Sequence, residues 1–155
     1  GPMINEEEAK RAKEWIDDAV DKGARIAVGG ERNGTILSPT IMTDVDENMK
    51  IIAEEVFAPI VSVIPFNTEE EAIEYSNDSI YGLQAGVFTS AINRALRVAD
   101  RLEMGGVWIN EISTYRQDNH PYGGVKQSGV GREGVKYAIE DMTEMKFIGI
   151  KIDQN

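Results

Sequence analysis

Apolar residues at regular spacing predict a helix near the start of the chain. Small and aliphatic residues recur every three or four positions from Ala9 to Val20, which indicates one face turned toward a core. Asn5 precedes this run as an N-terminal cap, and three consecutive glutamates follow at the positive end of the helix dipole. Gly23 ends the segment.

The rest of the pattern alternates between helices and strands. A capping box that begins at Thr68 opens a helix to about Asn77, and apolar faces predict further helices at residues 90–102 and 133–142. Short apolar runs predict strands at residues 25–28, 36–42, 60–66, 83–89, 106–110 and 145–152. Pro39 makes the second of these an edge or irregular strand. We therefore predict an α/β fold, an open, mostly parallel sheet with helical crossovers and a C-terminal edge strand.

Composition excludes several classes of protein. The 155 residues contain no cysteine, so they hold no disulfide framework, thiolate metal site or cysteine nucleophile. The 16 Lys and Arg against 27 Asp and Glu give a net charge of −11, which argues against nucleic acid or an anionic membrane as partner. No apolar run approaches the roughly 20 residues that span a bilayer, and no secretory signal opens the chain. We expect a cytoplasmic protein.

Three features suggest a ligand, but each has a plainer interpretation. Residues 129–134 match the glycine pattern of dinucleotide-binding loops, yet no buried strand precedes them, which favours a tight turn into a helix. His120 is the single histidine and cannot form a metal cluster, so we interpret it as a loop residue. The acidic runs at 6–8 and 69–71 fall in the first turns of helices, where carboxylates are expected on electrostatic grounds. The sequence thus predicts no metal site.

Glu55 and Phe57 form a more specific candidate, just before the strand predicted at residues 60–66. The Glu55 carboxylate could accept hydrogen bonds from two sugar hydroxyls. If the segment is extended, Phe57 points to the same side and could wall a ribose and its base. From the residues alone, a loop carboxylate beside core aromatics remains the favoured alternative.

The glycine-rich loop predicted at residues 111–130 is the longest segment without regular structure, and long loops in compact domains are often functional. Aromatic side chains and one arginine on such a loop suit a small-molecule pocket. Arg116 could hold a carboxylate or phosphate by a bidentate contact. An equally weighted alternative is that Arg116 pairs with a nearby acidic residue.

Four motifs taken together resemble one family. They are residues 54–59, 81–83, 106–110 and 121–133. In this order, within a match from residue 1 to residue 152, they resemble the C-terminal part of the catalytic domain of NAD(P)-dependent aldehyde dehydrogenases. The nearest branch is that of the lactaldehyde and non-phosphorylating glyceraldehyde-3-phosphate dehydrogenases. Position 58 is usually glycine in this family and is alanine here.

The resemblance implies roles for single residues. Glu55 matches the acid that binds the hydroxyls of the nicotinamide ribose, and Phe57 matches the ring beside the nicotinamide. Ser113, Thr114 and Tyr115 match the loop that lines the substrate tunnel, and Tyr122 matches an aromatic residue at its base. Arg116 lies about where phosphate-bearing aldehydes are gripped in the branch named above. The implied cofactor is NAD or NADP, and the implied partner is a small aldehyde.

The resemblance also implies what these residues lack. In the family a cysteine thiolate attacks the aldehyde to give a thiohemiacetal, and a glutamate-activated water later cleaves the thioester. Those residues and the cofactor domain precede the matched region, so we expect a fragment that is inactive alone and holds no catalytic residue.

The resemblance divides the chain into a partial catalytic domain at residues 1–142 and an oligomerisation strand with a tail at residues 143–155. It implies a homo-oligomer that assembles through this strand. Two alternatives remain, a non-catalytic scaffold or oligomerisation module, and a small dinucleotide binder built on residues 129–134.

Overall fold

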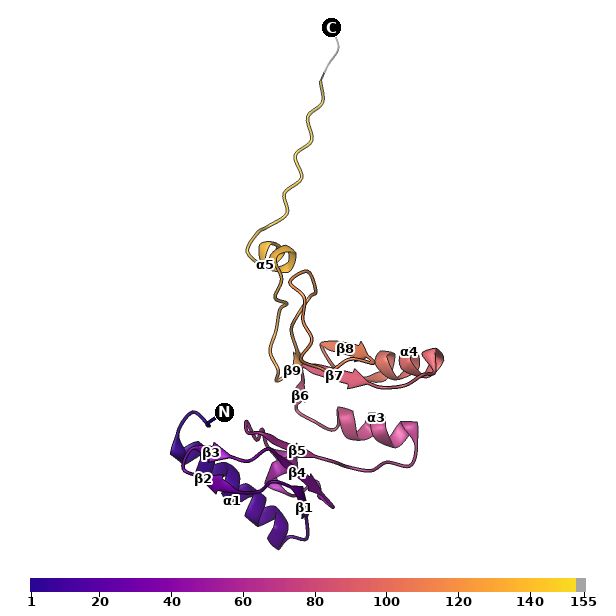
Figure 1. Ribbon diagram of the computed structural model, residues 1–155. Helices are drawn as coiled ribbons and strands as arrows, with labels where there is room; N and C mark the ends of the chain where they lie inside the picture. The colour runs from indigo at the N-terminus through magenta and orange to yellow at the C-terminus, as the bar shows by residue number, and fades with distance from the viewer. Residues whose placement is uncertain (153–155) are drawn as a thin grey trace. The chain divides into compact units, whose positions relative to one another are not determined.

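The computed structural model describes residues 1–152 and divides into two compact units, one from Gly1 to Phe66 and one from Asn67 onward (Figure 1). Among residues 1–152 no helix is long and apolar enough to cross a membrane.

Unit 1 is built around α1 (Glu6–Asp21), the helix that the spacing predicts. Asn5 caps it as expected, because its Oδ1 accepts a hydrogen bond from the backbone N–H of Glu8 at 2.8 Å. Strands β1 (Arg25–Val28), β4 (Thr40–Thr43) and β5 (Ile60–Ser62) form a sheet in the order β1-β4-β5. A short hairpin of β2 (Arg32–Asn33) and β3 (Ile36–Leu37) and the single turn of α2 (Lys50–Ala53) complete the unit.

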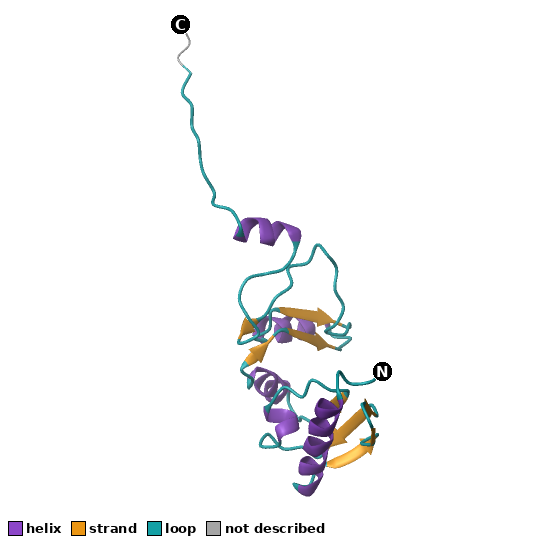
Figure 2. Ribbon diagram, turned by 90° about the vertical axis from the view of Figure 1, so that its left-hand side faces the viewer, coloured by secondary structure: helices purple, strands orange, loops and turns teal. Residues whose placement is uncertain are grey.

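The core of unit 1 lies between α1 and its sheet (Figure 2). Ala12, Ile16 and Ala19 lie on the apolar face of the helix and are fully buried. Met42 of β4 packs against them and is equally inaccessible. The predicted helix periodicity is therefore confirmed by burial, since these residues follow the three- and four-residue spacing.

Unit 2 contains a parallel β-α-β crossover. Strand β7 (Gln84–Val87) pairs in parallel with β8 (Gly106–Ile109), and α4 (Ile92–Arg101) connects them. Helix α3 (Glu69–Asn77) precedes this crossover, and Thr68 caps it as predicted. Strands β6 (Tyr81–Gly82) and β9 (Val125–Lys126) pair antiparallel, and α5 (Val135–Asp141) follows the glycine-rich loop.

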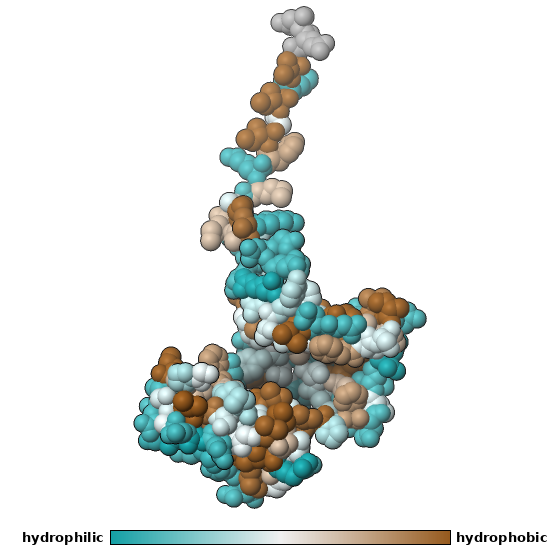
Figure 3. Space-filling view, in the orientation of Figure 1, coloured by the Kyte–Doolittle hydropathy of each residue, from teal (hydrophilic) through white to brown (hydrophobic). Residues whose placement is uncertain are grey.

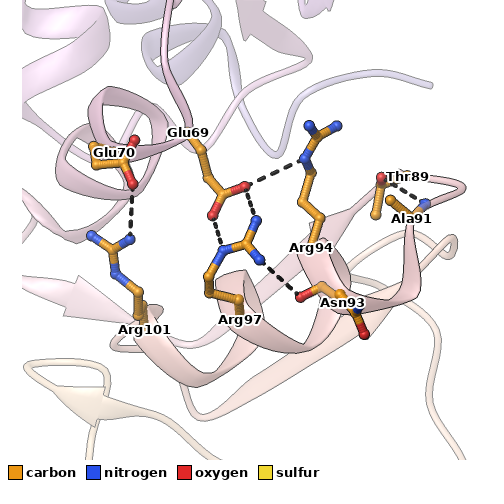
Figure 4. Close-up of polar contacts among 8 residues, drawn as sticks. All are labelled: Glu69, Glu70, Thr89, Ala91, Asn93, Arg94, Arg97 and Arg101. Atoms are coloured by element: carbon orange, nitrogen blue, oxygen red, sulfur yellow. Dashed lines mark hydrogen bonds and ion pairs between the residues drawn. The ribbon is translucent and has the colours of Figure 1, made fainter.

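An ion-pair network joins α3 to α4 (Figure 4). The Glu69 carboxylate accepts hydrogen bonds from Arg97 Nε at 2.6 Å and Arg97 Nη2 at 2.8 Å, and it lies 3.3 Å from Arg94 Nε. The two Arg97 bonds lower the pKa of Glu69 below its ordinary value. Glu70 and Arg101 form a second, longer pair at 3.4 Å. Bidentate arginine contacts have a defined geometry, so this network links the side chains of α3 and α4 in a fixed arrangement.

The predicted α/β class is confirmed, and the strand pairing is mixed. Strands β4 and β5 pair in parallel, as do β7 and β8, whereas β1 pairs antiparallel with β4. The strand predicted at residues 36–42 is interrupted at Pro39 and becomes β3 and β4, because proline cannot donate to a ladder.

Residues 145–152 depart from the predicted edge strand. None of the strand pairs within the described part of the chain includes these residues, and their large apolar side chains are exposed. Apolar and polar side chains follow one another along this segment (Figure 3). A strand is assigned only where backbone groups pair with a second strand, and no such ladder forms here. Of the segment predicted at 143–155, residues 153–155 lie outside the described residues.

Candidate functional site

Residues 54–59 of unit 1 are held by their backbone. The N–H of Glu54 donates to Lys50 O at 3.0 Å, and the Pro59 carbonyl accepts from the N–H of Thr40 at 2.9 Å. Between these ends, Arg11 Nη2 donates to the carbonyl of Val56 at 2.9 Å. The segment that carries Glu55 and Phe57 is therefore anchored at both ends and in the middle.

Side chains alternate along this segment. Val56 and Ala58 are half-buried and pack against the core of unit 1, whereas Glu55 and Phe57 are exposed. Glu55 makes no hydrogen bond or ion pair with residues 1–152, so both its carboxylate oxygens are open to a ligand. Such a carboxylate has the acceptor capacity for two vicinal hydroxyls. The structure thus leaves both predicted cofactor residues exposed on unit 1.

Phe57 has an uncommon backbone conformation. Its φ is +48°, in the left-handed region, and its ring is 81% exposed. A bulky side chain in this region costs about 1–3 kcal/mol, and such strain is concentrated at functional sites. Position 58, where the family usually has glycine, does not require one here. Ala58 is not among the described residues with positive φ, so its side chain causes no strain of this kind. The strained backbone is thus that of Phe57, whose ring is held away from the core.

Unit 2 contains a cavity of about 250 Å³ beside the crossover strands. We call it the aromatic pocket. Its lining residues are Gln84, Gly106, Val107, Trp108, Tyr115, Arg116, His120, Pro121 and Tyr122. Loop residues 115–122 thus close over β7 and β8 to form a concave, largely aromatic wall.

Trp108 organises the aromatic pocket. Its indole Nε1 donates to Gln84 Oε1 at 3.1 Å, which ties β8 to β7 through side chains. The Tyr115 ring meets Trp108 edge-on with centroids 5.0 Å apart, and the His120 ring lies 5.3 Å away. Edge-on aromatic contacts of this kind stabilise a defined ring geometry. Trp108 and Gln84 are site residues that the sequence analysis did not single out.

Arg116 is held by two neighbours. Its Nη2 lies 2.5 Å from Glu133 Oε2, and its guanidinium carbon lies 4.4 Å from the ring centroid of Tyr122. Tyr122 and Glu133 are themselves joined by two backbone hydrogen bonds, of 2.6 and 3.2 Å. The alternative interpretation of Arg116, a pair with a nearby acid, is therefore what the structure shows, while Arg116 still lines the pocket.

Two of the four remaining predicted substrate residues lie apart from the cavity. Ser113 and Thr114 are exposed and do not line the aromatic pocket, whereas Tyr115 and Tyr122 do. His120, interpreted from sequence as a plain loop residue, is half-buried against Trp108. Its Nδ1 is enclosed and has no hydrogen-bond partner within residues 1–152. A buried unsatisfied nitrogen is uncommon and marks a place where a ligand or water can bind.

The other candidates of the sequence lie in a glycine turn and in the first turns of helices. Residues 129–134 follow no buried strand and lead into α5 through glycines with positive φ, at Gly129, Gly131 and Gly134. The acidic runs occupy the first turns of α1 and α3. In the part of the chain that the structure describes, no three acidic or histidine side chains are grouped to hold a metal ion.

Comparison with known proteins identifies the family. The sequence pattern of the aldehyde dehydrogenase family matches residues 1–148. The chain belongs to the aldehyde dehydrogenase family. The resemblance of residues 54–59, 81–83, 106–110 and 121–133 to this family is thereby confirmed.

Three relatives of this aldehyde dehydrogenase chain are informative. The 3-sulfolactaldehyde dehydrogenase of Priestia aryabhattai is 48% identical over 98% of this chain and 32% of its own length. Aldehyde dehydrogenase 21 from Physcomitrella patens, solved with its reaction product succinate, is 42% identical with a TM-score of 0.90, over 93% of this chain and 30% of that one. The glyceraldehyde-3-phosphate dehydrogenase GapN of Methanocaldococcus jannaschii, solved with NADP, is 44% identical with a TM-score of 0.87, over 94% and 32%. The chain thus spans about a third of the relatives that it matches.

Proposed function

We propose that the chain is part of an NAD(P)-dependent aldehyde dehydrogenase, in which unit 1 contributes contacts to the cofactor and unit 2 contributes a wall of the aldehyde site. The full-length enzyme would contain this chain and the remaining two thirds of its relatives' length. The observation that carries the proposal is the pair of exposed side chains, Glu55 and Phe57, on a segment anchored by its backbone. The family match and the NADP bound to the GapN relative support the same assignment.

The residues of unit 1 fit a nicotinamide nucleotide. Glu55 offers two free carboxylate oxygens to the ribose hydroxyls, and the Phe57 ring offers an apolar wall beside the base. When bound, the cofactor accepts hydride from the substrate. Phe57 is held at positive φ with its ring 81% exposed, so the ring is available to a ligand without unpacking from the core, and this preorganisation favours binding.

The nucleophile lies outside these 155 residues, which contain no cysteine. The contribution of unit 2 is therefore to bind and orient the aldehyde. Tyr115, Tyr122 and Trp108 present ring surfaces to the substrate chain, and the enclosed Nδ1 of His120 offers a polar contact. Apolar walls with few polar groups are typical of small-molecule sites.

We further propose that the aldehyde carries an anionic group that contacts Arg116. The Arg116 side chain lines the pocket and is 48% exposed, and its planar guanidinium matches a carboxylate, sulfonate or phosphate. The names of the three relatives include sulfolactaldehyde, succinate and glyceraldehyde-3-phosphate, which each bear such a group. An anionic substrate would share Arg116 with Glu133 or displace that carboxylate.

The substrate assignment is tested in the full-length enzyme by Arg116→Met. We expect KM for an anionic aldehyde, such as succinate semialdehyde, to rise at least about tenfold, because a charge-assisted contact is lost. KM for a neutral aldehyde of similar length should change less than about twofold. Equal changes for both aldehydes would contradict the anionic assignment.

The cofactor assignment is tested by Phe57→Gly, which removes the ring while keeping a residue that adopts positive φ without strain. We expect KM for NAD(P) to rise at least about fivefold with KM for the aldehyde unchanged. Phe57→Tyr keeps an aromatic face and should stay close to the parent. An unchanged KM for NAD(P) in Phe57→Gly would contradict the role of the ring.

Residues 145–152 suit assembly with a second copy. Their exposed apolar side chains include Met145, Phe147, Ile148, Ile150 and Ile152. We propose that this segment pairs as a strand with another subunit, as the edge-strand pattern predicts. Light scattering on the full-length enzyme should show an oligomer, and Phe147→Asp should reduce its mass. An unchanged mass would contradict the role of this segment.

A further inference from the structure

Arg11 on α1 is fixed by three different contacts. Its Nε and Nη2 lie 2.8 and 2.7 Å from Glu8 Oε2, and its Nη2 also donates to the Val56 carbonyl at 2.9 Å. The guanidinium carbon lies 4.5 Å from the ring centroid of Trp15. Only 28% of the Arg11 side chain is exposed. The planar group is thus held by a carboxylate, a ring and a backbone carbonyl.

This arrangement begins at the N-terminal cap of α1. Asn5 accepts the N–H of Glu8 and fixes the first turn, so the Glu8 carboxylate stands one turn before Arg11 on the same face. Trp15 lies one turn after Arg11 and packs against the core of unit 1. Because all three residues lie on one helix, the helix sets the position of the guanidinium. The hydrogen bond from Arg11 then fixes the Val56 carbonyl relative to α1.

The Val56 carbonyl lies between the two proposed cofactor residues. It belongs to the peptide unit that includes the N–H of Phe57, so its orientation sets the starting point for the φ of +48° at Phe57. Thr40 and Lys50 hold only the two ends of residues 54–59. Among the described residues, Arg11 is the side chain that holds the middle of the segment by a hydrogen bond.

We propose that Arg11 is a positioning residue for the cofactor. It holds the Val56 carbonyl so that Glu55 and Phe57 face the same ligand, and Glu8 and Trp15 keep the guanidinium aimed. This inference rests on the proposed function, since it assigns to Arg11 the preorganisation of the NAD(P) contacts. A helix residue that touches neither cofactor nor substrate would then set the affinity for the cofactor.

The test is Arg11→Met in the full-length enzyme, which keeps the length of the side chain and removes its donors. We expect KM for NAD(P) to rise about tenfold, with kcat and KM for the aldehyde changed less than about twofold. Arg11→Lys retains the charge and one donor direction, so its KM for NAD(P) should rise by an intermediate amount. This conservative variant keeps the test valid if Arg11→Met fails to fold. Lys10→Met, which breaks an exposed pair with Glu6, is the matched control and should leave every constant unchanged.

A purely structural role would lower thermal stability without separating the two KM values. The inference is overturned if Arg11→Met and Lys10→Met have the same KM for NAD(P) while Phe57→Gly raises it. If neither Arg11→Met nor Phe57→Gly changes that KM, the proposed cofactor site is itself wrong, and the role of Arg11 falls with it.

A second readout does not need the cofactor. In the chain alone, the N–H of Glu54, which donates to Lys50 O at the start of this segment, should exchange at least about fivefold faster in Arg11→Met than in Lys10→Met, because the segment loses its central anchor. Equal exchange rates in the two variants would show that Arg11 does not position this segment.

Discussion

The two units differ in how they support their part of the site. In unit 1 the helix α1 and the sheet enclose a core whose largest fully buried side chains are Ile16, Met42 and Thr40. In the described residues of unit 2 the buried hydrophobic residues are Ile73 and Ala95, and many large apolar side chains are exposed. Unit 1 therefore resembles an independently folded body far more than unit 2 does.

The difference extends to the site residues. Glu55 and Phe57 lie on a segment anchored by backbone hydrogen bonds to core elements, so their geometry follows from the fold of unit 1. The aromatic pocket depends on side-chain contacts between a loop and β8, such as that of Tyr115 with Trp108. Sites on rigid elements are better preorganised than sites on loops. We expect the cofactor contacts to be preformed and the substrate wall to adapt to its ligand.

The largest predicted effect is in the core of unit 1. Ile16→Ala should lower the free energy of unfolding of this unit by about 2–5 kcal/mol, because it leaves a cavity in an enclosed core. Val20→Ala on the same helix, where the side chain is 40% exposed, should cost only about 0.5 kcal/mol. Denaturant titration in a Trp108→Phe background would report on unit 1 through Trp15. Equal costs would contradict the core described for unit 1.

The equivalent change in unit 2 should be smaller. Ile73→Ala removes a side chain that is 4% exposed, but few neighbours are buried, so the site can collapse and we expect about 2 kcal/mol. A Trp15→Phe background would let Trp108 report this transition. A cost above that of Ile16→Ala would reverse the comparison between the units.

Helix caps offer a matched pair across the two units. Asn5→Ala and Thr68→Ala each remove one cap hydrogen bond, to Glu8 and Glu71 respectively, and should each cost about 1 kcal/mol. Each should accelerate hydrogen exchange in its own unit alone. Asn5→Asp and Thr68→Ser keep a cap and serve as controls. Acceleration in both units from one substitution would show that they open together.

The smallest effect concerns pH and α3. The pKa of Glu69 is lower in the folded state because it accepts hydrogen bonds from Arg97, so the stability from this pair is complete above the ordinary value of 4.5 and is lost as the pH falls below it. In Glu69→Gln, the thermal stability of unit 2 should decrease less than in the parent as the pH falls below 4.5. Glu70→Gln, whose pair with Arg101 is exposed, is the control. Part of the pH dependence should remain, since hydrogen bonds from Asn67 also lower the pKa of Glu71.

Sequence patterns predicted the longer elements well. The limits of α1 and α3 follow from Asn5 and Thr68, whose caps are local chemistry. Helix α2 was missed because it is a single turn without a side-chain cap. The pairs β2–β3 and β6–β9 were missed because two residues are too few to show an alternating pattern. The strand predicted at 145–152 has the right alternation, but a ladder needs a pairing strand as well.

The site was predictable only in part. Glu55 and Phe57 were identified by their motif, and their exposure follows from the alternation with Val56. Arg116 could be assigned either to a ligand or to an acid, because its partner Glu133 lies 17 residues away and nothing local indicates the contact. Long-range contacts of this kind depend on how the loop folds back, which local patterns do not encode.

The central claim is that Glu55 and Phe57 form the preorganised contact with the cofactor. Its most direct test compares Glu55→Gln with Glu54→Gln, two adjacent exposed positions, in the full-length enzyme. We expect Glu55→Gln to raise KM for NAD(P) about tenfold or more without changing KM for the aldehyde, while Glu54→Gln behaves like the parent enzyme. The same KM for NAD(P) in both variants would contradict it.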